Sequence, residues 1–258
     1  MFLQDITPFE GNGQKNAKGQ TLQAFLQSYD PHRYDTPSVT TDIIVLQVPK
    51  GAKDCVKGGR VLLIRRGNHP CIGMWALPGG FVDMKENLVD GARRELREET
   101  GVSDVPLEAV GVWGDWQRDP RTRVITVPHL AILEEEREAA AGDDAGDARW
   151  FTLSFAKTGE EEENGVCRET WALTLTGGGD TLCPVIERSY HTKALLQQEA
   201  FRVKEPGGVA VDHSAILLQA LLHARRALQQ RGERSGFSPP YNAARVRLPP
   251  KGEGQSAK

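Results

Sequence analysis

The sequence has few cysteines, and none of them stand at the spacing of a zinc knuckle or a redox centre. Its four cysteines contain no C-x-x-C pair. This argues against a four-cysteine zinc module and against thioredoxin-like chemistry. Reduced thiols are the simplest expectation, although spacing alone leaves a pairing of Cys167 with Cys183 open.

The chain also lacks a long apolar run and a strong charge of either sign. No stretch approaches the roughly 20 apolar residues of a membrane helix, and Met1–Asp5 opens no basic segment followed by an apolar one. The formal net charge is −3, so there is no basic bias of the kind that marks nucleic-acid-binding domains. We expect a cytoplasmic protein with no membrane and no nucleic-acid partner.

What is present is the composition of a soluble globular protein, with 39% hydrophobic and 26% charged residues. Residues 1–38 contain several glycines and prolines and are interpreted as an N-terminal extension. Residues 39–230 are expected to form one domain, with an insertion at about 156–205. The polar, Pro- and Gly-rich residues 231–258 are predicted to be a disordered tail.

Hydrophobic periodicity predicts alternating strands and helices. Leu88, Ala92 and Leu96 recur every four residues, which predicts a helix over 88–100, and Gly101 suits a left-handed cap at its end. A second amphipathic helix is expected over 214–229. Strands are expected at 41–48, 60–66, 107–113, 124–133 and 149–153, with a hairpin through 171–176 and 181–186 and a solvated loop or frayed helix over 134–147.

The most specific pattern runs from the loop at 77–81 through the first helix. It reads G-x5-E-x7-R-E-U-x-E-E-x-G-U, where U is aliphatic. The nine specified residues are Gly80, Glu86, Arg94, Glu95, Leu96, Glu98, Glu99, Gly101 and Val102. Nine coinciding positions, several of them charged, make the signal very specific.

The carboxylates in this pattern have a physical cost that a ligand would remove. Glu95, Glu98 and Glu99 fall at i, i+3 and i+4, which places them on one side of the helix. Like charges at that spacing cost roughly 0.2–0.5 kcal/mol per pair, and the helix dipole disfavours anions near its C-terminal end. Carboxylate oxygens suit Mg²⁺ or Mn²⁺. The alternative is an acidic solvated face balanced by Arg94 and Arg97.

The pattern resembles the Nudix box at every specified position. The resemblance implies an α+β fold, a Nudix-type α/β/α sandwich with a mixed β-sheet between the two predicted helices. It implies metal-dependent hydrolysis of the pyrophosphate bond in a nucleoside diphosphate linked to another moiety. The catalytic residues implied are Arg94, Glu95, Glu98 and Glu99, and the metal ligands are Gly80, Glu95, Glu98 and Glu99.

Two roles remain to be assigned within that family pattern. Glu86, together with Arg94, is expected to orient the loop and the other glutamates. The general base is left open between Glu95 and a glutamate of the segment that follows the 124–133 run. That segment offers Glu134, Glu135 and Glu136.

A second, less specific segment points to the substrate. Arg118-Asp119-Pro120-Arg121, followed by a predicted strand, is similar to ADP-ribose pyrophosphatases and to NAD-related regulators built on the same domain. Arg118, Arg121, Arg123 and Trp116 are the substrate-binding candidates, although a charged turn between strands would explain the arginines equally well. The expected reaction cleaves ADP-ribose or a related ADP-sugar to AMP and a sugar phosphate.

Other readings of the same domain remain. One is a ligand-sensing transcription regulator derived from the Nudix fold, which would need a DNA-binding module after the domain. Another is a Nudix enzyme that acts on nucleoside triphosphates or NADH. The sequence leaves the assembly state open, a homodimer included.

Overall fold

The computed structural model describes residues 2–139, 145–195 and 198–233. The chain divides into two compact units at Thr36 and Pro37, and each is described by itself. The first unit contains a 3-10 turn, η1 (Thr7–Phe9), and a short helix, α1 (Leu22–Ser28). The hydroxyl of Thr21 accepts a hydrogen bond from the Ala24 amide and caps the start of α1.

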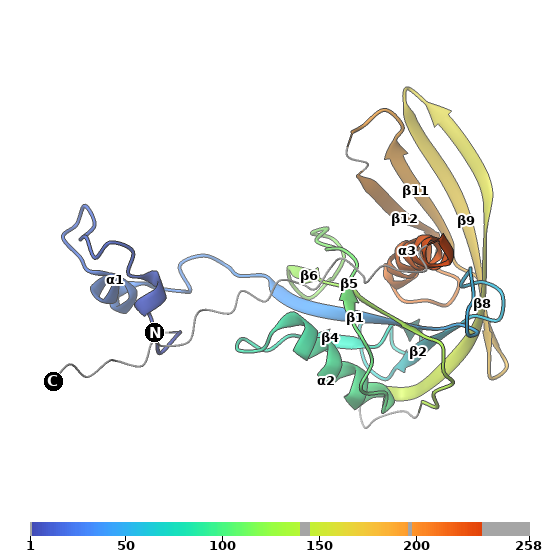
Figure 1. The fold of residues 1–258 in the computed structure, drawn as a ribbon, viewed down its shortest axis with the longest axis horizontal. Helices are drawn as coiled ribbons and strands as arrows, with labels where there is room; N and C mark the ends of the chain where they lie inside the picture. The colour runs from blue at the N-terminus through green and yellow to red at the C-terminus, as the bar shows by residue number, and fades with distance from the viewer. Residues whose placement is uncertain (1, 140–144, 196–197, 234–258) are drawn as a thin grey trace. The chain divides into compact units, whose positions relative to one another are not determined.

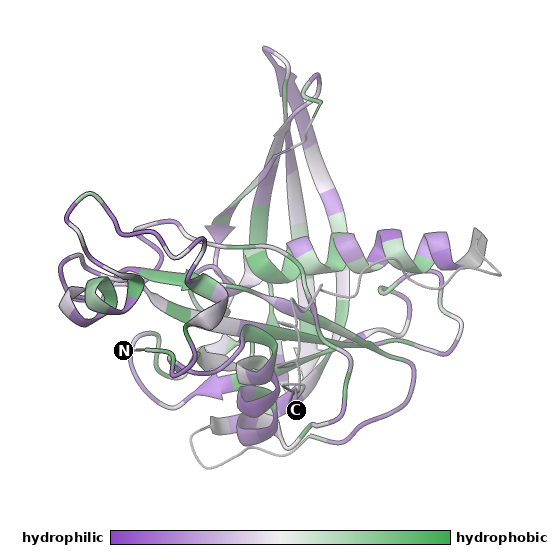
Figure 2. Ribbon diagram, turned by 60° about the vertical axis from the view of Figure 1, so that its left-hand side comes forward, coloured by the Kyte–Doolittle hydropathy of each residue, from purple (hydrophilic) through white to green (hydrophobic). Residues whose placement is uncertain are grey.

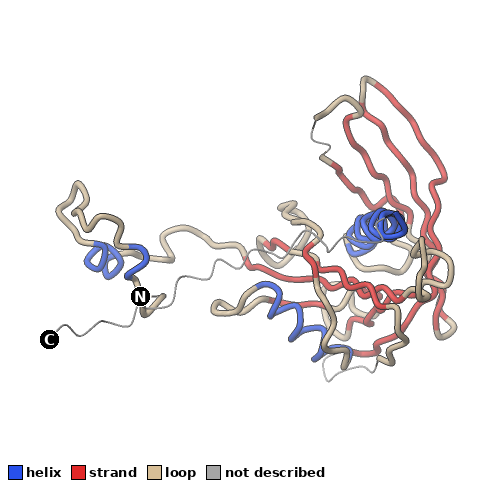
Figure 3. The backbone as a smooth tube through the Cα atoms, viewed as in Figure 1, coloured by secondary structure: helices blue, strands red, loops and turns tan. Residues whose placement is uncertain are grey.

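The second unit is built on one large mixed sheet (Figures 1 and 3). Its strands are β1 (Ser38–Gln47), β2 (Arg60–Arg66), β3 (Trp75–Ala76), β4 (Gly79–Phe81), β5 (Glu108–Ala109), β6 (Val124–Thr126), β7 (His129–Leu133), β8 (Ala145–Glu163), β9 (Val166–Gly177), β10 (Asp180–Leu182), β11 (Val185–His191) and β12 (Glu199–Glu205). The main path runs β12-β11-β9-β8-β2-β1-β7-β5. β1 pairs in parallel with β6 and β7, and the other paired strands are antiparallel. The predicted mixed sheet is therefore confirmed.

Helices cover both faces of this sheet, and β1 is therefore buried on both sides. Ile43 and Val45 pack with the buried residues of α2 (Leu88–Thr100), while Ile44 and Leu46 join the cluster that contains α3 (His213–Glu233). Successive residues of a strand point to opposite faces, so this division is the expected consequence of strand geometry. The α/β/α sandwich predicted from the resemblance is confirmed.

Both predicted helices of this unit are present. α2 begins and ends at the predicted residues, and Gly101 follows it at φ +70° with its amide bonded to the Arg97 carbonyl. α3 begins at His213 and extends to Glu233, so its last residues lie in the segment predicted as the start of a disordered tail. Residues 234–258 of that tail lie outside the described residues. Figure 2 shows apolar residues of α3 gathered along the side toward the sheet.

The segment predicted as an insertion forms long strands. β8 and β9 pair from Thr152–Thr176 to Glu163–Val166, and β11 and β12 continue the sheet beside β9. The predicted hairpin is present. β9 and β10 are joined by a turn at Gly178 and Gly179 and pair with each other, and β11 then pairs with β9 as well. Buried positions alternate along β9 from Cys167 to Leu175, which is the pattern of a strand with one covered face.

Two predicted strands were wrong in extent, and the predicted loop or frayed helix over 134–147 is confirmed only as a loop over 134–139. The 107–113 run forms only β5 and an isolated bridge at Trp113, and the 124–133 run divides into β6 and β7 at Val127–Pro128, where proline has no amide hydrogen to donate. Residues 134–139 are not helical, and residues 145–147 already belong to β8; residues 140–144 lie outside the described residues.

The four cysteines are free thiols, so the Cys167–Cys183 pairing left open above does not form. In the described ranges, no helix combines the length and the apolar character needed to cross a membrane.

Candidate functional site

A cavity of about 480 Å³ opens where the first half of β1, β4, α2 and the start of α3 meet. The loops at 66–70 and 118–121 complete its wall. Strand pairing places the residues of the Nudix-like pattern here. β4 pairs with β1 from Thr40–Phe81 to Asp42–Gly79. In this position the backbone of Gly79 and Gly80 lies against the Glu95 and Glu99 carboxylates of α2. The structure thus brings the two ends of the sequence pattern together at one cavity.

Arg94 is the centre of an ion-pair network beside that cavity. Its Nε and Nη2 donate to the two carboxylate oxygens of Glu86 at 3.0 and 2.9 Å, and Nη2 also donates to the Phe81 carbonyl at 3.0 Å. Its Nη1 donates to Glu95 at 2.7 Å and to Glu98 at 3.2 Å. Hydrogen bonding to Arg94 lowers the pKa of Glu86, and hydrogen bonds to Glu86 and Glu95 raise that of Arg94. One guanidinium therefore ties the loop to the helix.

Glu99 is the most buried of the box carboxylates. Its Oε2 accepts a hydrogen bond of 2.7 Å from the Gly79 amide. Burial, with a smaller contribution from the Glu95 charge, raises the pKa of Glu99 to about 7. Burial also raises the pKa of Glu95. Arg94 compensates the charge of Glu95, whereas Glu99 has no ion-pair partner among the described residues.

These donors fit a hard divalent cation. A Cβ atom built on Gly80 would lie 2.5 Å from Glu95 Oε1, so the carboxylate occupies space that only a glycine leaves free. The described residues contain no group of three or more acidic, His or Cys side chains already arranged around a metal position. Arg94 supplies the positive charge beside Glu95 and Glu98 here. The donors are carboxylate oxygens, and the buried one, Glu99, is poorly compensated, as a cation site requires.

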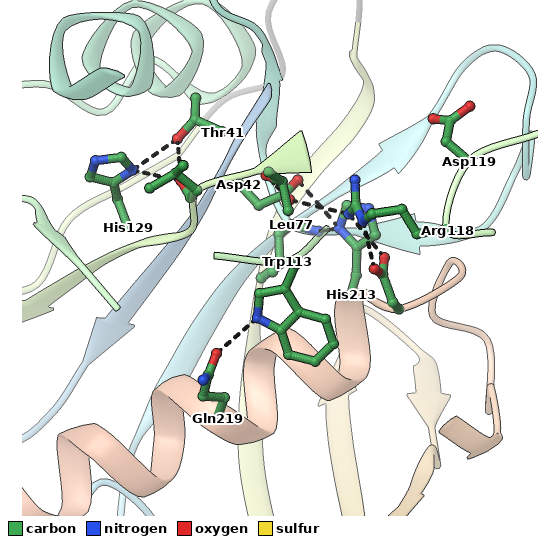
Figure 4. Close-up of polar contacts among 12 residues, drawn as sticks. Thr41, Asp42, Leu77, Trp113, Arg118, Asp119, His129, His213 and Gln219 are labelled. Atoms are coloured by element: carbon green, nitrogen blue, oxygen red, sulfur yellow. Dashed lines mark hydrogen bonds and ion pairs between the residues drawn. The ribbon is translucent and has the colours of Figure 1, made fainter. Parts of the chain in front are cut away.

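The predicted substrate residue Arg118 lines the cavity but is already paired. Its side chain is 8% exposed, and Nε and Nη2 donate to the two carboxylate oxygens of Asp212 at 2.9 and 3.2 Å. A second carboxylate, Asp42, lies 3.8 Å from Nη2 (Figure 4). Asp42 also accepts a hydrogen bond from the Thr126 hydroxyl. Nδ1 of His213 lies 3.9 Å from Asp42 and accepts a bond from the Leu77 amide.

The other predicted substrate residues are divided by the structure. Arg121 lines the cavity, pairs with Asp119 at 2.8 Å and stacks over the Phe81 ring at 5.3 Å. The hydrogen bond from Arg121 lowers the pKa of Asp119. Arg123 and Trp116 are exposed and do not line the cavity, and Trp116 is 71% exposed. The structure therefore brings only Arg118 and Arg121 of this set to the cavity.

The glutamates considered as an alternative base lie elsewhere. Glu134 and Glu135 line a separate depression with Arg231, and Glu136 pairs with Arg60. Their position follows from register, because Leu133 pairs with Gln47 at the end of β1 remote from Asp42. Asp42 and Arg66 also line the cavity, although neither was a predicted site residue. A charged residue inside the apolar β1 run was the one available signal for Asp42.

Comparison with known proteins agrees with this geometry. A family model for the NUDIX domain matches residues 51–169. Among curated relatives, the ADPR responsive transcriptional repressor NtrR of Acinetobacter baylyi is 36% identical over 136 residues, which are 52% of this chain and 52% of that protein. The ADP-ribose pyrophosphatase of Methanocaldococcus jannaschii is 41% identical over 99 residues, 38% of this chain and 57% of that protein. The chain thus spans little more than half the length of these two relatives.

A solved structure extends the similarity over most of the chain. It is a MutT/nudix family protein from Enterococcus faecalis, 32% identical, with a TM-score of 0.55. The match covers 80% of this chain and 70% of that one. With the sandwich fold, the complete box and a relative matched over most of its length, the chain belongs to the Nudix family.

Proposed function

We propose that this protein is a metal-dependent pyrophosphohydrolase that cleaves ADP-ribose, or a related ADP-sugar, to AMP and a sugar phosphate. The observation that carries the proposal is the placement of Glu95 and Glu99 against the Gly79–Gly80 backbone at the edge of a 480 Å³ cavity. A cavity of that size accommodates a small nucleotide. The pyrophosphatase name of the archaeal relative supports the substrate.

In this proposal Glu95, Glu98, Glu99 and the Gly80 carbonyl hold Mg²⁺ or Mn²⁺. Nudix hydrolases generally use divalent metals, and when bound such an ion supplies positive charge against the pyrophosphate oxygens and lowers the pKa of water. Arg94 and Glu86 keep the loop and the helix in register through their bidentate pair. The hydrolase domain spans residues 39–230, with 156–205 as its insertion.

The position of Glu95 supports it as the general base within this proposal. Glu95 borders the cavity, whereas the side chains of Glu134, Glu135 and Glu136 do not. A general base has to reach the attacking water directly or through one further water. Glu95 is therefore the candidate general base of this proposal.

The test is an activity profile of the purified chain with Mg²⁺ over ADP-ribose, an ADP-sugar, NADH and an oxidised nucleoside triphosphate. We expect the fastest turnover with ADP-ribose, AMP as a product by chromatography, and loss of turnover after exhaustive EDTA treatment. The Glu99→Gln variant serves as the inactive control. Fast turnover of the triphosphate with none of ADP-ribose would overturn the substrate, and full activity in EDTA would overturn the metal dependence.

A second function is favoured by one observation, the transcriptional repressor among the curated relatives. A helix-turn-helix reader needs two adjacent helices. In the part of the second unit that the structure describes, α2 and α3 both pack on the sheet, and α3 is the one helix after residue 205. Specific, ADP-ribose-sensitive retention of a DNA fragment by the purified chain would favour the regulator, and its absence at high protein concentration would favour the enzyme alone.

A further inference from the structure

Val211 has a backbone conformation that its side chain disfavours, at a point where it lines the cavity. Among the described residues, four that are not glycine have a positive φ: Cys71, Asp104, Asn164 and Val211. Asp and Asn enter this region readily, whereas a β-branched residue there is a genuine outlier. Val211 has a φ of +40° and belongs to the cavity lining. Strain of this kind persists only where the surrounding structure enforces it.

The strain is enforced by hydrogen bonds on both sides of Val211. The His213 amide donates to the Ala210 carbonyl at 3.0 Å, which closes a turn with Val211 as its second residue. A positive φ at that position of a turn favours glycine. The Ala210 amide donates to the Trp75 carbonyl at 2.8 Å, and the Leu77 amide donates to Nδ1 of His213 at 3.2 Å (Figure 4). Both ends of the turn are therefore fixed to the segment at the end of β3.

The residue after Val211 is held in place as well. Asp212 accepts two hydrogen bonds from the Arg118 guanidinium, and its carbonyl accepts the first amides of α3. A rotation of Val211 to a negative φ would redirect the chain between Ala210 and Asp212, so these hydrogen bonds could not all be kept. The fold thus fixes the direction in which the Val211 side chain leaves the backbone.

Packing within the protein does not account for a valine in this turn. Val211 is 41% exposed, so its side chain gains little from burial against other residues. Glycine would take the same conformation without strain. A branched apolar side chain that is both strained and exposed at a cavity wall is explained if a bound ligand covers it.

The cavity has an acidic part and an apolar part. Glu95 and Glu99 border it beside the glycine loop, whereas Ile64 and Ala210, which also line it, belong to one buried apolar cluster. Val211 follows Ala210 in the chain and extends this apolar part. An apolar side chain cannot replace the hydration of phosphate oxygens. Of the parts of an ADP-sugar, the base offers the largest apolar face.

We propose that Val211 is a specificity-determining residue of this cavity, held in a strained turn so that its side chain contacts the base of the bound nucleotide. The proposal rests on the pyrophosphohydrolase function proposed above. The strained backbone lowers the free energy of unfolding, and the contact raises the affinity for a ligand that carries a base. Removal of the side chain therefore changes stability and affinity in opposite directions.

The experiment measures unfolding in urea and, by calorimetry in the presence of Mg²⁺, the binding of three probes that cannot be hydrolysed at their bridge. The probes are methylenediphosphonate, α,β-methylene ADP and α,β-methylene ADP-ribose, of which only the last two carry a base. The variants are Val211→Gly, Val211→Ala and a matched control, Asn164→Gly. The control places glycine at a φ of +53° in the exposed turn between β8 and β9.

We expect Val211→Gly to unfold at a higher urea concentration than the wild type, because glycine relieves the strain. Both Val211 variants should bind the two nucleotide probes about tenfold more weakly, because the contact between the methyl groups and the base is lost. Neither variant should change the affinity for methylenediphosphonate. Asn164→Gly should bind all three probes as the wild type does.

Three results would overturn the contact with the base. The first is wild-type affinity of both Val211 variants for the nucleotide probes. The second is an equal loss of affinity for methylenediphosphonate. The third is a loss in Val211→Gly alone, because the backbone rather than the side chain would then be responsible. A lower urea midpoint or loss of the fold in Val211→Gly overturns the strain, and Val211→Ala then decides the contact.

The probes also separate this proposal from the one it rests on. Suppose that the wild type binds α,β-methylene ADP in a Val211-dependent way, but neither binds α,β-methylene ADP-ribose nor cleaves ADP-ribose. That result overturns the substrate and keeps the role of Val211. Hydrolysis of ADP-ribose together with wild-type affinities in both Val211 variants keeps the substrate and overturns the role of Val211. Binding of neither nucleotide probe by the wild type overturns both.

Discussion

Arg118 and Asp212 form a bidentate ion pair that joins two segments 94 residues apart in the sequence. Asp212 immediately precedes α3, and its carbonyl accepts the amides of Ala215 and Ile216 in the first turn. Because the Arg118 side chain is only 8% exposed, the pair is largely withdrawn from water. The relationship makes Arg118 a link between the 118–121 loop and the start of α3.

A double-mutant cycle on this pair should show strong coupling. Arg118→Met leaves the half-buried Asp212 without its partner, and Asp212→Asn leaves the buried Arg118 with only Asp42, 3.8 Å from its Nη2, so each should lower the free energy of unfolding by about 3 kcal/mol. The double variant should lose at least about 1 kcal/mol less than the sum of the two. Urea unfolding of the four proteins measures this. Additivity within about 0.5 kcal/mol would show that the two side chains act independently.

Gly80 should be intolerant of alanine for a reason that lies in the site rather than in the backbone. A Cβ there would meet Glu95 Oε1 at 2.5 Å, while at Gly114 the nearest atom to a Cβ is 3.8 Å away, in Ile125. Neither glycine has a positive φ, so the backbone accepts alanine at both. We expect Gly80→Ala to bind Mn²⁺ about tenfold more weakly, roughly 1.4 kcal/mol, with its secondary structure kept. Gly114→Ala is the control; equal Mn²⁺ affinities in the two variants would contradict a role for the Gly80–Glu95 contact.

Glu98 and Glu99 should respond differently in stability and alike in activity. Either Gln variant should lose at least about a hundredfold in turnover, because a charged ligand is removed from the proposed metal site. In metal-free protein, Glu99→Gln should raise the free energy of unfolding by on the order of 1 kcal/mol, since it removes a half-buried carboxyl whose pKa is raised by burial. Glu98 is 51% exposed, and its Gln variant should stay within about 0.5 kcal/mol of wild type. Wild-type turnover in both would mean that these residues form only a solvated acidic face.

Local sequence signals were sufficient for α2 and the box because everything they specify lies within about 25 residues. The four-residue spacing and Gly101 predicted α2 to the residue, and the Gly80–Glu95 proximity follows from β4 and α2 being consecutive in the chain. Contacts that depend on strand register or on tertiary packing could not be predicted from the sequence. Asp212 meets Arg118 only once α3 packs on the sheet, and Glu134 lies away from the cavity because β7 runs parallel to β1.

The ion-pair partners of the arginines could not be predicted from the sequence either. Arg118 and Arg66 are the same residue type in similar polar surroundings, and no local pattern tells that the first is paired and the second is not. The pairing of Arg118 depends on Asp212, which the tertiary fold positions beside it. Substrate contacts inferred from a short motif are therefore less secure than metal ligands that share one helix face.

In the 156–205 segment, two carboxylates flank Arg188. Glu169 accepts hydrogen bonds from Arg188 at 2.7 Å and from the Trp171 indole at 2.9 Å, and Arg188 also donates to Glu199. Burial on its own raises the pKa of Glu169, but the hydrogen bonds from Trp171 and Arg188 outweigh it and leave that pKa below its usual value of 4.5. Glu199 is affected in the same sense, with Arg188 and Arg226 opposing burial.

A carboxyl whose pKa is lowered by folding stabilises the folded state fully above its unfolded pKa. That contribution is lost as the pH falls through the folded value. We therefore expect the wild type to lose stability on acidification below about pH 4.5, and Glu169→Gln to lose less over the same window while being less stable at pH 7. Urea unfolding between pH 3 and 7 measures both curves. Burial lowers the pKa of His223. Protonation of His223 therefore lowers the free energy of unfolding from a pH nearer neutral. This loss is the same in both proteins and cancels in the difference between their curves. Glu161→Gln, at an exposed position of β8, should follow the wild type. Parallel curves for wild type and Glu169→Gln would show that the carboxylate between Trp171 and Arg188 does not set the acid limit of this fold.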